Sequence, residues 1–269
     1  MFTYQNNVYT SSVLAVPGVR HAFSTRLGGV SENEATASMN VAFGRGDDDE
    51  TVRRNVGILA ASVGATADDV VCAPQVHSDR VRFVTGANRG EGVTRDASHK
   101  GDGFFTKTPG VALLVRTADC SPILLAGLRG DGKPAVAAVH AGWRGAAQGI
   151  ALLAVYALRS IGVAPENVFA AIGPCASFER YEVGEDMRAE VAALAGADIA
   201  SRYVRDHGGS LHADVAGINR EFLLAAGVPE AHVDVAGICT IGDPARFHSH
   251  RASRGNRGTM GNVIMIEAD

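Results

Sequence analysis

The sequence predicts an α+β fold with mixed β-sheets in a single domain over residues 1–269. Apolar, β-rich runs bounded by Gly and Pro predict strands, and segments with apolar residues at helical spacing predict helices. The two kinds of segment follow one another irregularly, which favours mixed sheets over a regular doubly wound sheet. The chain has no internal repeat and no Pro- or Ser-rich linker, so we expect one domain.

The first third of the chain predicts two strands and a helix. Residues 18–26, "GVRHAFSTR", are typical of a strand that enters a glycine turn. Residues 47–64 predict a helix, because valine and leucine recur at helical spacing and acidic residues fill its first turn. We expect Asp48 or Asp49 to cap this helix. Residues 79–85 alternate as in a strand.

The rest of the chain is richer in buried elements. Residues 110–128 and 134–143 are apolar runs of the kind found in strands buried on both faces. Residues 144–161 predict one helix. The remaining elements are a strand over 167–175, helices that each stop at a glycine over 184–196 and 213–227, and strands over 232–239 and 262–268.

Composition excludes several classes of function. A net charge of −4 and a pI near 6.1 argue against a nucleic-acid partner, which requires a basic face. The longest apolar run is interrupted by Arg159, so no membrane span is predicted. The first ten residues lack the basic and apolar parts of a secretory signal. We expect a cytoplasmic protein, and the sequence indicates no oligomeric state.

The four cysteines are too sparse for a disulfide scaffold and form no C-x-x-C pair, so we expect reduced thiols. One of them belongs to a set of three metal-capable residues, each at the end of a strand-like run: His77 in "APQVHS", Cys120 in "VRTADCSP" and His140 in "AAVHAGWRG". Two imidazoles and a thiolate are a common zinc set, and three ligands leave a fourth position open for catalysis. The spacing is too wide for a zinc finger. His and Cys at strand ends are also common core residues, so spacing alone leaves both interpretations open.

The motifs around these residues resemble the YfiH family, also described as laccase-domain or polyphenol-oxidase-like proteins. "TADCSPILL" is followed by "VHAGWRG", with "QVHS" upstream and "AIGPC" downstream. "TRLGGVSENEATASMN" and "GDGFFTKTPGVALLVRTADC" match as well, so the resemblance covers nearly the whole chain. It implies a four-layer α/β/β/α fold with mixed sheets. It also implies a catalytic zinc site at His77, Cys120 and His140.

The resemblance implies a purine nucleoside phosphorylase that takes adenosine, inosine or methylthioadenosine with phosphate, and deaminates adenosine at the same site. Copper can replace zinc in such a set. We predict that Arg26 and Arg144 bind phosphate, because the planar guanidinium group pairs with phosphate oxygens. Asn40 and Trp143 are predicted to contact substrate. For Arg26 a solvated surface position is an equal alternative. For Trp143 a core position is slightly favoured, because a buried strand precedes it.

Other positions have weaker support. Asp119 is expected to fix a turn or support the metal site from outside, and the remaining candidates for ligand contact are Ser31, Gln75 and Asp102. The segment "FHSHRASRGNRGTMGN" departs from the family pattern, because His248 and His250 replace aromatic residues and a T-G-R is missing.

Three other functions stay open. A copper-dependent polyphenol oxidase requires several coppers and paired histidines, whereas the one H-x-H here is His248–His250. Without metal, Cys120 as nucleophile and His140 as base would form an amide hydrolase or deamidase. A binding protein is the third, and no charged tail or large apolar helix face favours it.

Overall fold

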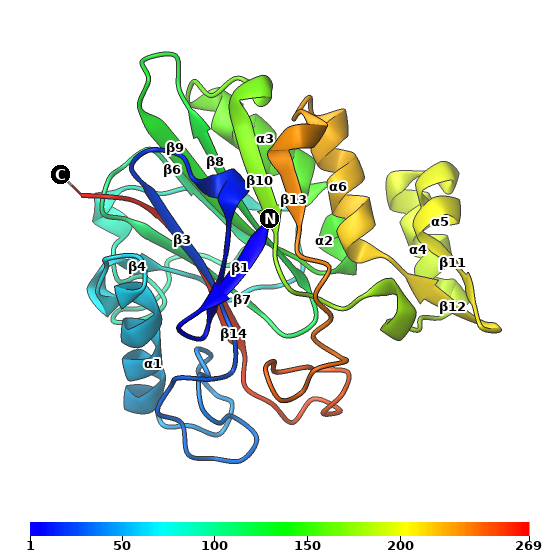
Figure 1. Cartoon of the computed structure of the whole chain (residues 1–269), viewed down its shortest axis with the longest axis horizontal. Coiled ribbons are helices and arrows are strands. Elements are labelled where there is room, and N and C mark those ends of the chain that lie inside the picture. The colour runs from blue at the N-terminus through cyan, green and yellow to red at the C-terminus, as the bar shows by residue number, and fades with distance from the viewer. Residues whose placement is uncertain (269) are drawn as a thin grey trace.

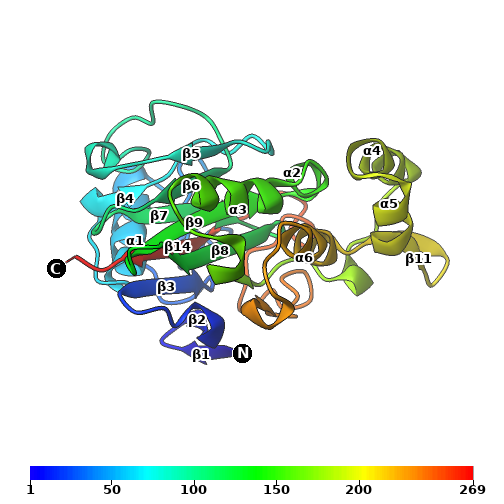
Figure 2. The ribbon, with the colours of Figure 1, turned by 90° about the horizontal axis from the view of Figure 1, so that it is seen from above.

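In the computed structural model, which describes residues 1–268, two six-stranded sheets lie face to face and helices cover their outer sides (Figures 1 and 2). The order of layers is helix, sheet, sheet, helices. The predicted α+β class and its four-layer arrangement are confirmed. Both sheets are mixed, as expected from the irregular order of strands and helices along the chain.

The first sheet has the strand order β1–β2–β3–β14–β7–β4. Neighbouring strands are antiparallel except β4 and β7, which are parallel. Its N-terminal hairpin was not predicted from the sequence. The strands are β1 (Phe2–Gln5), β2 (Val8–Ser11), β3 (Val19–Ser24), β4 (Val70–Val71), β7 (Ala112–Thr117) and β14 (Met260–Ile266).

The second sheet has the order β13–β10–β8–β9–β6–β5. Its outer pairs, β13 with β10 and β5 with β6, are parallel, and the pairs between them are antiparallel. The strands are β5 (Val81–Phe83), β6 (Gly103–Thr106), β8 (Ser121–Leu128), β9 (Pro134–Ala141), β10 (Val168–Ile172) and β13 (Val233–Val235).

Helix α1 (Asp49–Ala61) covers the first sheet, and Asp48 caps it by accepting the backbone N–H of Thr51, as predicted. On the second sheet lie α3 (Ile150–Ser160) and α6 (Val215–Ala225). Farther out are α4, α5 and a small hairpin (Figure 2), with bounds α4 (Glu185–Ala195), α5 (Ala197–Tyr203), β11 (Val204–His207) and β12 (Ser210–Ala213).

The prediction of one helix over 144–161 is wrong. The structure has α2 (Trp143–Ala147) and then α3, separated at Gly149, whose φ of 81° is left-handed. Glycine adopts this conformation without a steric penalty, so the helix is interrupted although the apolar pattern continues through it.

The central strands are buried on both faces, which explains their continuous apolar sequence. In β7, Leu113 and Val115 pack between the two sheets, while Ala112 and Leu114 pack under α1. The chain then crosses from the first sheet to the second in the turn 118–120, between β7 and β8. This crossing point carries one of the predicted metal ligands.

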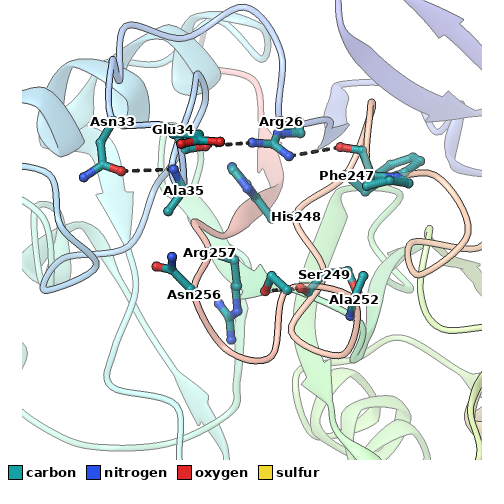
Figure 3. Close-up of a pocket in the computed structure, with 12 residues that line it drawn as sticks. Arg26, Asn33, Glu34, Ala35, Phe247, His248, Ser249, Ala252, Asn256 and Arg257 are labelled. Carbon is teal, nitrogen blue, oxygen red and sulfur yellow. Dashed lines mark hydrogen bonds between the residues drawn. The ribbon is translucent and has the colours of Figure 1, made fainter.

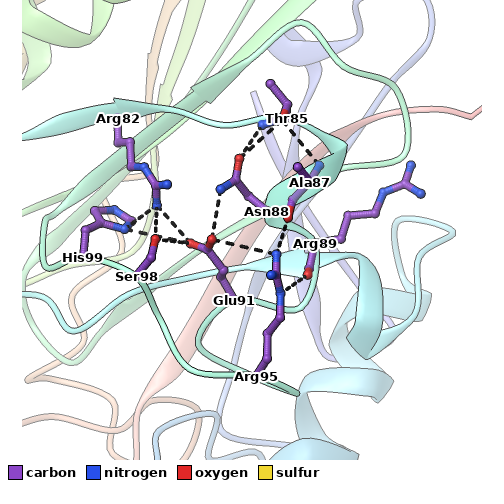
Figure 4. A network of polar contacts seen from close by, with 9 residues as sticks. All are labelled: Arg82, Thr85, Ala87, Asn88, Arg89, Glu91, Arg95, Ser98 and His99. Carbon is purple, nitrogen blue, oxygen red and sulfur yellow. Dashed lines mark hydrogen bonds and ion pairs between the residues drawn. The ribbon is translucent and has the colours of Figure 1, made fainter.

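The loop between β5 and β6 is fixed by a polar network around Glu91, which is 5% exposed (Figure 4). Its carboxylate accepts hydrogen bonds from Asn88, Arg82 and Ser98. Burial alone raises the pKa of Glu91, but these donors together lower it. The network anchors the long segment that leads to Asp102.

All four cysteines are free thiols, as expected. Within residues 1–268 no helix combines the length and the apolar composition that crossing a membrane requires.

Candidate metal centre

The structure brings His77, Cys120 and His140 together at one end of the two sheets. Their ligand atoms all lie within 4.8 Å of one another. Cys120 sits in the turn before β8, and the pairing of Ser121 with Ala141 places it beside His140 near the end of β9. His77 follows β4, and its Nε2 lies 3.8 Å from the Cys120 Sγ. His140 therefore lies near the end of a strand and Cys120 in the turn between two strands, as predicted, whereas His77 lies in the loop between β4 and β5 and not at a strand end.

Backbone conformation at the centre is unusual in ways that serve this convergence. His77 has a φ of 59° and Asp119 a φ of 89°, both in the left-handed region. A Cβ at Gly142 would lie 2.5 Å from the His77 Cδ2, so glycine is required there. This requirement explains the glycine directly after "VHA" in the motif.

Asp102 organises the centre from behind. It is fully buried and accepts the backbone N–H groups of Val76, His77 and Ser78 at 3.2, 3.0 and 2.7 Å. Its Oδ1 also lies 2.8 Å from Nδ1 of His140, which leaves Nε2 as the free ring nitrogen. A carboxylate in this position fixes the orientation of a metal-binding histidine. From the sequence, Asp102 was predicted only as a minor candidate for ligand contact. The pattern that could have indicated its supporting role is an acidic residue between two glycines, directly before an apolar strand.

The electrostatics of the centre favour an anionic sulfur. Burial alone raises the pKa of Cys120, but the neighbouring His140 and His77 imidazoles lower it to about 6. Burial likewise lowers the pKa of His140, while Cys120 and Asp102 raise it to about 9. Hydrogen bonds from His140 and Ser78 outweigh the effect of burial on Asp102 and lower its pKa to about 2. A thiolate is the form of cysteine that binds metals.

The donor set fits zinc. Ligands on one tetrahedral zinc lie about 3.5 Å apart, because zinc–ligand distances are about 2.0–2.3 Å. The 3.8 Å between Cys120 and His77 is close to this value. A His₂Cys set also resembles trigonal copper sites, so geometry alone does not choose between the two metals. His77 is exposed and Cys120 half-buried, so the open side of the set faces a cavity of about 260 Å³.

The walls of this metal-centre cavity are positively charged. Arg45, Arg116 and Arg257 line it, and no Asp or Glu does. Among residues 1–268 none of the three forms an ion pair with a carboxylate, although other arginines of the chain do so on the surface. None of these arginines was predicted from the sequence, because Arg45 and Arg257 lie in loops and Arg116 near the end of β7, and nothing in their local sequence indicates that they converge.

Of the four predicted substrate contacts, Arg26 and Asn40 lie near the centre but outside its cavity. The Arg26 guanidinium donates to the carbonyls of Ala37 and Pro244, and it lines a neighbouring cavity. The side-chain amide of Asn40, which is fully buried, is held by Ala42, Asp47 and Thr259. A substrate-binding role for both stays a prediction.

Trp143 and Arg144 line another cavity, of about 570 Å³, that does not include the three metal-capable residues. Trp143 packs partly against the core of the second sheet and carries the Arg144 guanidinium 4.1 Å above its ring. Arg144 Nε also lies 3.2 Å from Glu190. Contacts of Trp143 and Arg144 with substrate stay a prediction.

The minor candidates have structural partners. The Asp119 carboxylate accepts from Thr240, Ser249 and the backbone N–H of Arg251, and so fixes the C-terminal loop to the Cys120 turn. Gln75 bonds both the N–H and the carbonyl of Arg116, and Ser31 bonds Asp47.

Comparisons with known proteins agree with the fold and the motifs. The family model described as multi-copper polyphenol oxidoreductase laccase matches residues 20–267. A protein of Deinococcus radiodurans named purine nucleoside phosphorylase is 39% identical over 93% of this chain and 89% of its own length. One of that name from Bacteroides thetaiotaomicron is 32% identical over 95% and 94%.

Solved structures show the same architecture. A hypothetical protein YfiH of Bacillus licheniformis superposes with a TM-score of 0.89 at 28% identity, covering 99% of both chains. YlmD of Geobacillus stearothermophilus superposes with a TM-score of 0.88 at 30% identity and the same coverage. Fold, motifs and family model thus agree, and the chain belongs to the YfiH family of laccase-domain proteins.

Proposed function

We propose that this protein is a zinc-dependent purine nucleoside phosphorylase acting on adenosine, inosine and methylthioadenosine, with adenosine deaminase activity at the same site. The observation that carries the proposal is the His₂Cys set facing a cavity lined by three arginines and no carboxylate. The relatives named purine nucleoside phosphorylase support this reaction class.

In this proposal His77, Cys120 and His140 hold zinc. Bound there, zinc would supply a divalent positive charge with one open coordination position. Asp102 keeps Nδ1 of His140 hydrogen-bonded, so that Nε2 is available as a ligand. The Asp102 bonds to three successive backbone N–H groups hold the His77 loop in place.

Arg45, Arg116 and Arg257 bind phosphate. Guanidinium groups donate paired hydrogen bonds to phosphate oxygens, and the absence of acids from the cavity wall leaves their charge available for an anion. Holding phosphate beside the anomeric carbon supplies much of the rate enhancement, because it converts an encounter of two molecules into a reaction of neighbours. This assignment supplements the predicted phosphate contacts at Arg26 and Arg144.

Two alternatives are distinguishable from the proposal. The low pKa of Cys120 beside His140 favours a metal-free amide hydrolase. A laccase reaction would draw on several copper sites, whereas residues 1–268 contain one cluster of three such ligands.

Protein purified without chelator tests both the metal content and the reaction. We expect about one zinc per chain, and release of free base from adenosine and inosine only when phosphate is present. Release of base at equal rates with and without phosphate contradicts the phosphorylase. Metal-free protein that reacts stoichiometrically with a thiol reagent and cleaves amides supports the hydrolase instead.

A further inference from the structure

A second cavity, of about 590 Å³, lies next to the metal-centre cavity and shares Arg257 with it. We call it the His248 cavity; Arg26, Phe247, His248, Asn256 and Arg257 are in its wall. Figure 3 shows the His248 ring between Arg26 and Arg257, with the Asn256 amide beside Arg257. The function proposed above does not use this cavity.

Buried polar atoms without partners gather at this cavity. His248 is 1% exposed, and neither of its ring nitrogens has a hydrogen-bond partner among residues 1–268. The same holds for Arg257 Nε, whereas the unpartnered hydroxyl of Thr259 lies at the metal-centre cavity. Native proteins pair nearly all of their buried polar groups. Two such side chains in the wall of one cavity therefore point to a ligand that completes their hydrogen bonds.

The charge at the cavity specifies the kind of ligand. Neither Arg26 nor Arg257 forms an ion pair with a carboxylate of residues 1–268, and Arg26 donates to main-chain carbonyls instead. Glu34 is the acid in the wall. Asp47 acts on His248 from behind, but Ser31, Thr36 and Asn40 already hold its carboxylate.

The state of His248 agrees with a cationic surrounding. Burial, together with the charges of Arg26 and Arg257, lowers the pKa of His248 to about 3. The ring is therefore neutral near pH 7 and does not add to the positive charge of the two arginines. An anion in the cavity would offset this charge and accept the hydrogen of the imidazole.

We propose that the His248 cavity binds a phosphoryl group, separately from the phosphate proposed at the metal centre. A phosphoryl group has the charge and the several acceptor oxygens that paired guanidinium groups bind. Its source is either free phosphate or the phosphate of a nucleotide whose sugar lies at the metal centre. The second source rests on the proposed function, whereas the first does not.

The variant His248→Phe tests this proposal without changing a metal ligand or an arginine. It keeps an aromatic ring in the buried position and returns the residue to the aromatic type of the family pattern, while removing the imidazole nitrogens. His232→Phe is the matched control. His232 also has an unpartnered, buried Nδ1, but it stacks on Phe169 with ring centroids 4.1 Å apart and lines neither cavity.

Calorimetry on the zinc-loaded protein measures binding of inorganic phosphate, adenosine and adenosine 5′-monophosphate. We expect two phosphates per chain in the unmodified protein and in His232→Phe, and one in His248→Phe. If the phosphoryl group is that of a nucleotide, the monophosphate binds at least about tenfold more tightly than adenosine, and His248→Phe removes about that factor.

Either result supports a phosphoryl site, and the second identifies its source. One phosphate per chain in all three proteins, with equal affinities for adenosine and its monophosphate, overturns the proposal while leaving the proposed function intact. If adenosine and the monophosphate both fail to bind and phosphate still occupies two sites, the nucleoside phosphorylase fails and the phosphoryl site stands.

Discussion

The metal centre and the loop 248–259 lie side by side, but they differ in the hydrogen bonding of their buried polar groups. At the centre, Asp102 accepts three backbone N–H groups and the Ser78 hydroxyl and pairs with His140. In the loop, His248, Arg257 and Thr259 bury polar atoms that have no hydrogen-bond partner within residues 1–268. The protein itself supplies hydrogen-bond partners for Asp102 at the centre, whereas it supplies none for these atoms of the loop among residues 1–268.

This difference reflects two ways of preparing a site. A metal centre needs fixed ligand directions, so supporting hydrogen bonds hold its side chains in one geometry. An anion site can leave donors unpaired, because the ligand provides their acceptors on binding and gains affinity from them. We therefore expect substitutions at the centre to weaken metal binding. Replacing an unpartnered polar side chain of the loop should instead raise the free energy of unfolding.

The largest effect is expected for Cys120→Ala. Removing the thiolate leaves two imidazoles, which bind zinc far more weakly than the His₂Cys set. We expect zinc per chain to fall below one tenth and phosphorolysis to fall by at least about 100-fold. Metal analysis and base release measure this. Cys239→Ala, a free cysteine outside the ligand cluster, is the control and should keep its zinc.

Asp102→Asn should weaken the centre without removing a ligand. The amide nitrogen cannot accept hydrogen bonds, so part of the Val76–Ser78 backbone and the His140 ring lose their partner. Loss of such support lowers metal affinity about 10- to 100-fold. Competition with a chelator measures the affinity. Ser78→Ala removes one donor to Asp102 and should have a smaller effect; equal zinc affinity in Asp102→Asn and the parent would contradict the orienting role.

Arg45→Met should affect phosphate rather than metal. We expect the KM for phosphate to rise about tenfold, since one charge-assisted hydrogen bond is lost, while zinc content stays at the parent level. Steady-state kinetics at varied phosphate concentration measure the change. Arg144→Met compares the sequence-based assignment with the structural one, and a larger rise in KM there would favour Arg144 as the phosphate residue.

The smallest effect, and one of opposite sign, is expected for His248→Phe. Replacing an unpartnered imidazole by phenyl should raise the free energy of unfolding by about 1 kcal/mol at pH 7. Urea unfolding measures it.

The pH dependence of this variant follows from the lowered pKa of His248. Since that pKa is about 3 in the folded protein and about 6.5 when unfolded, the unfolded chain takes up the proton first as pH falls. The parent therefore loses stability below pH 6.5, by up to about 1.4 kcal/mol per pH unit, and His248→Phe lacks this loss. Parallel stability profiles from pH 7 to 5 would show that His248 is not buried as a neutral ring.

Sequence patterns predicted elements well where burial is simple. The apolar runs of β7, β8 and β9 predicted buried strands, because residues covered on both faces must be apolar. The pattern failed at Gly149, where one conformation of a single residue ends a helix within a continuous apolar segment. It also missed the hairpins β1–β2 and β11–β12, the buried strands β4 and β6, and helix α5, since elements this short leave a weak periodic signal whether they are exposed or buried.

By itself, the sequence determined the class of the fold and the chemistry of three side chains, because burial and metal affinity depend on residue type and local pattern. Tertiary structure alone decided which charged groups share a cavity. Arg45, Arg116 and Arg257 meet at the centre while Arg144 pairs with Glu190 elsewhere, and Asp102 proves to be the support of His140. The physical reason is that charge acts through space, and the distances between these residues are set by packing of the two sheets and not by their separation along the chain.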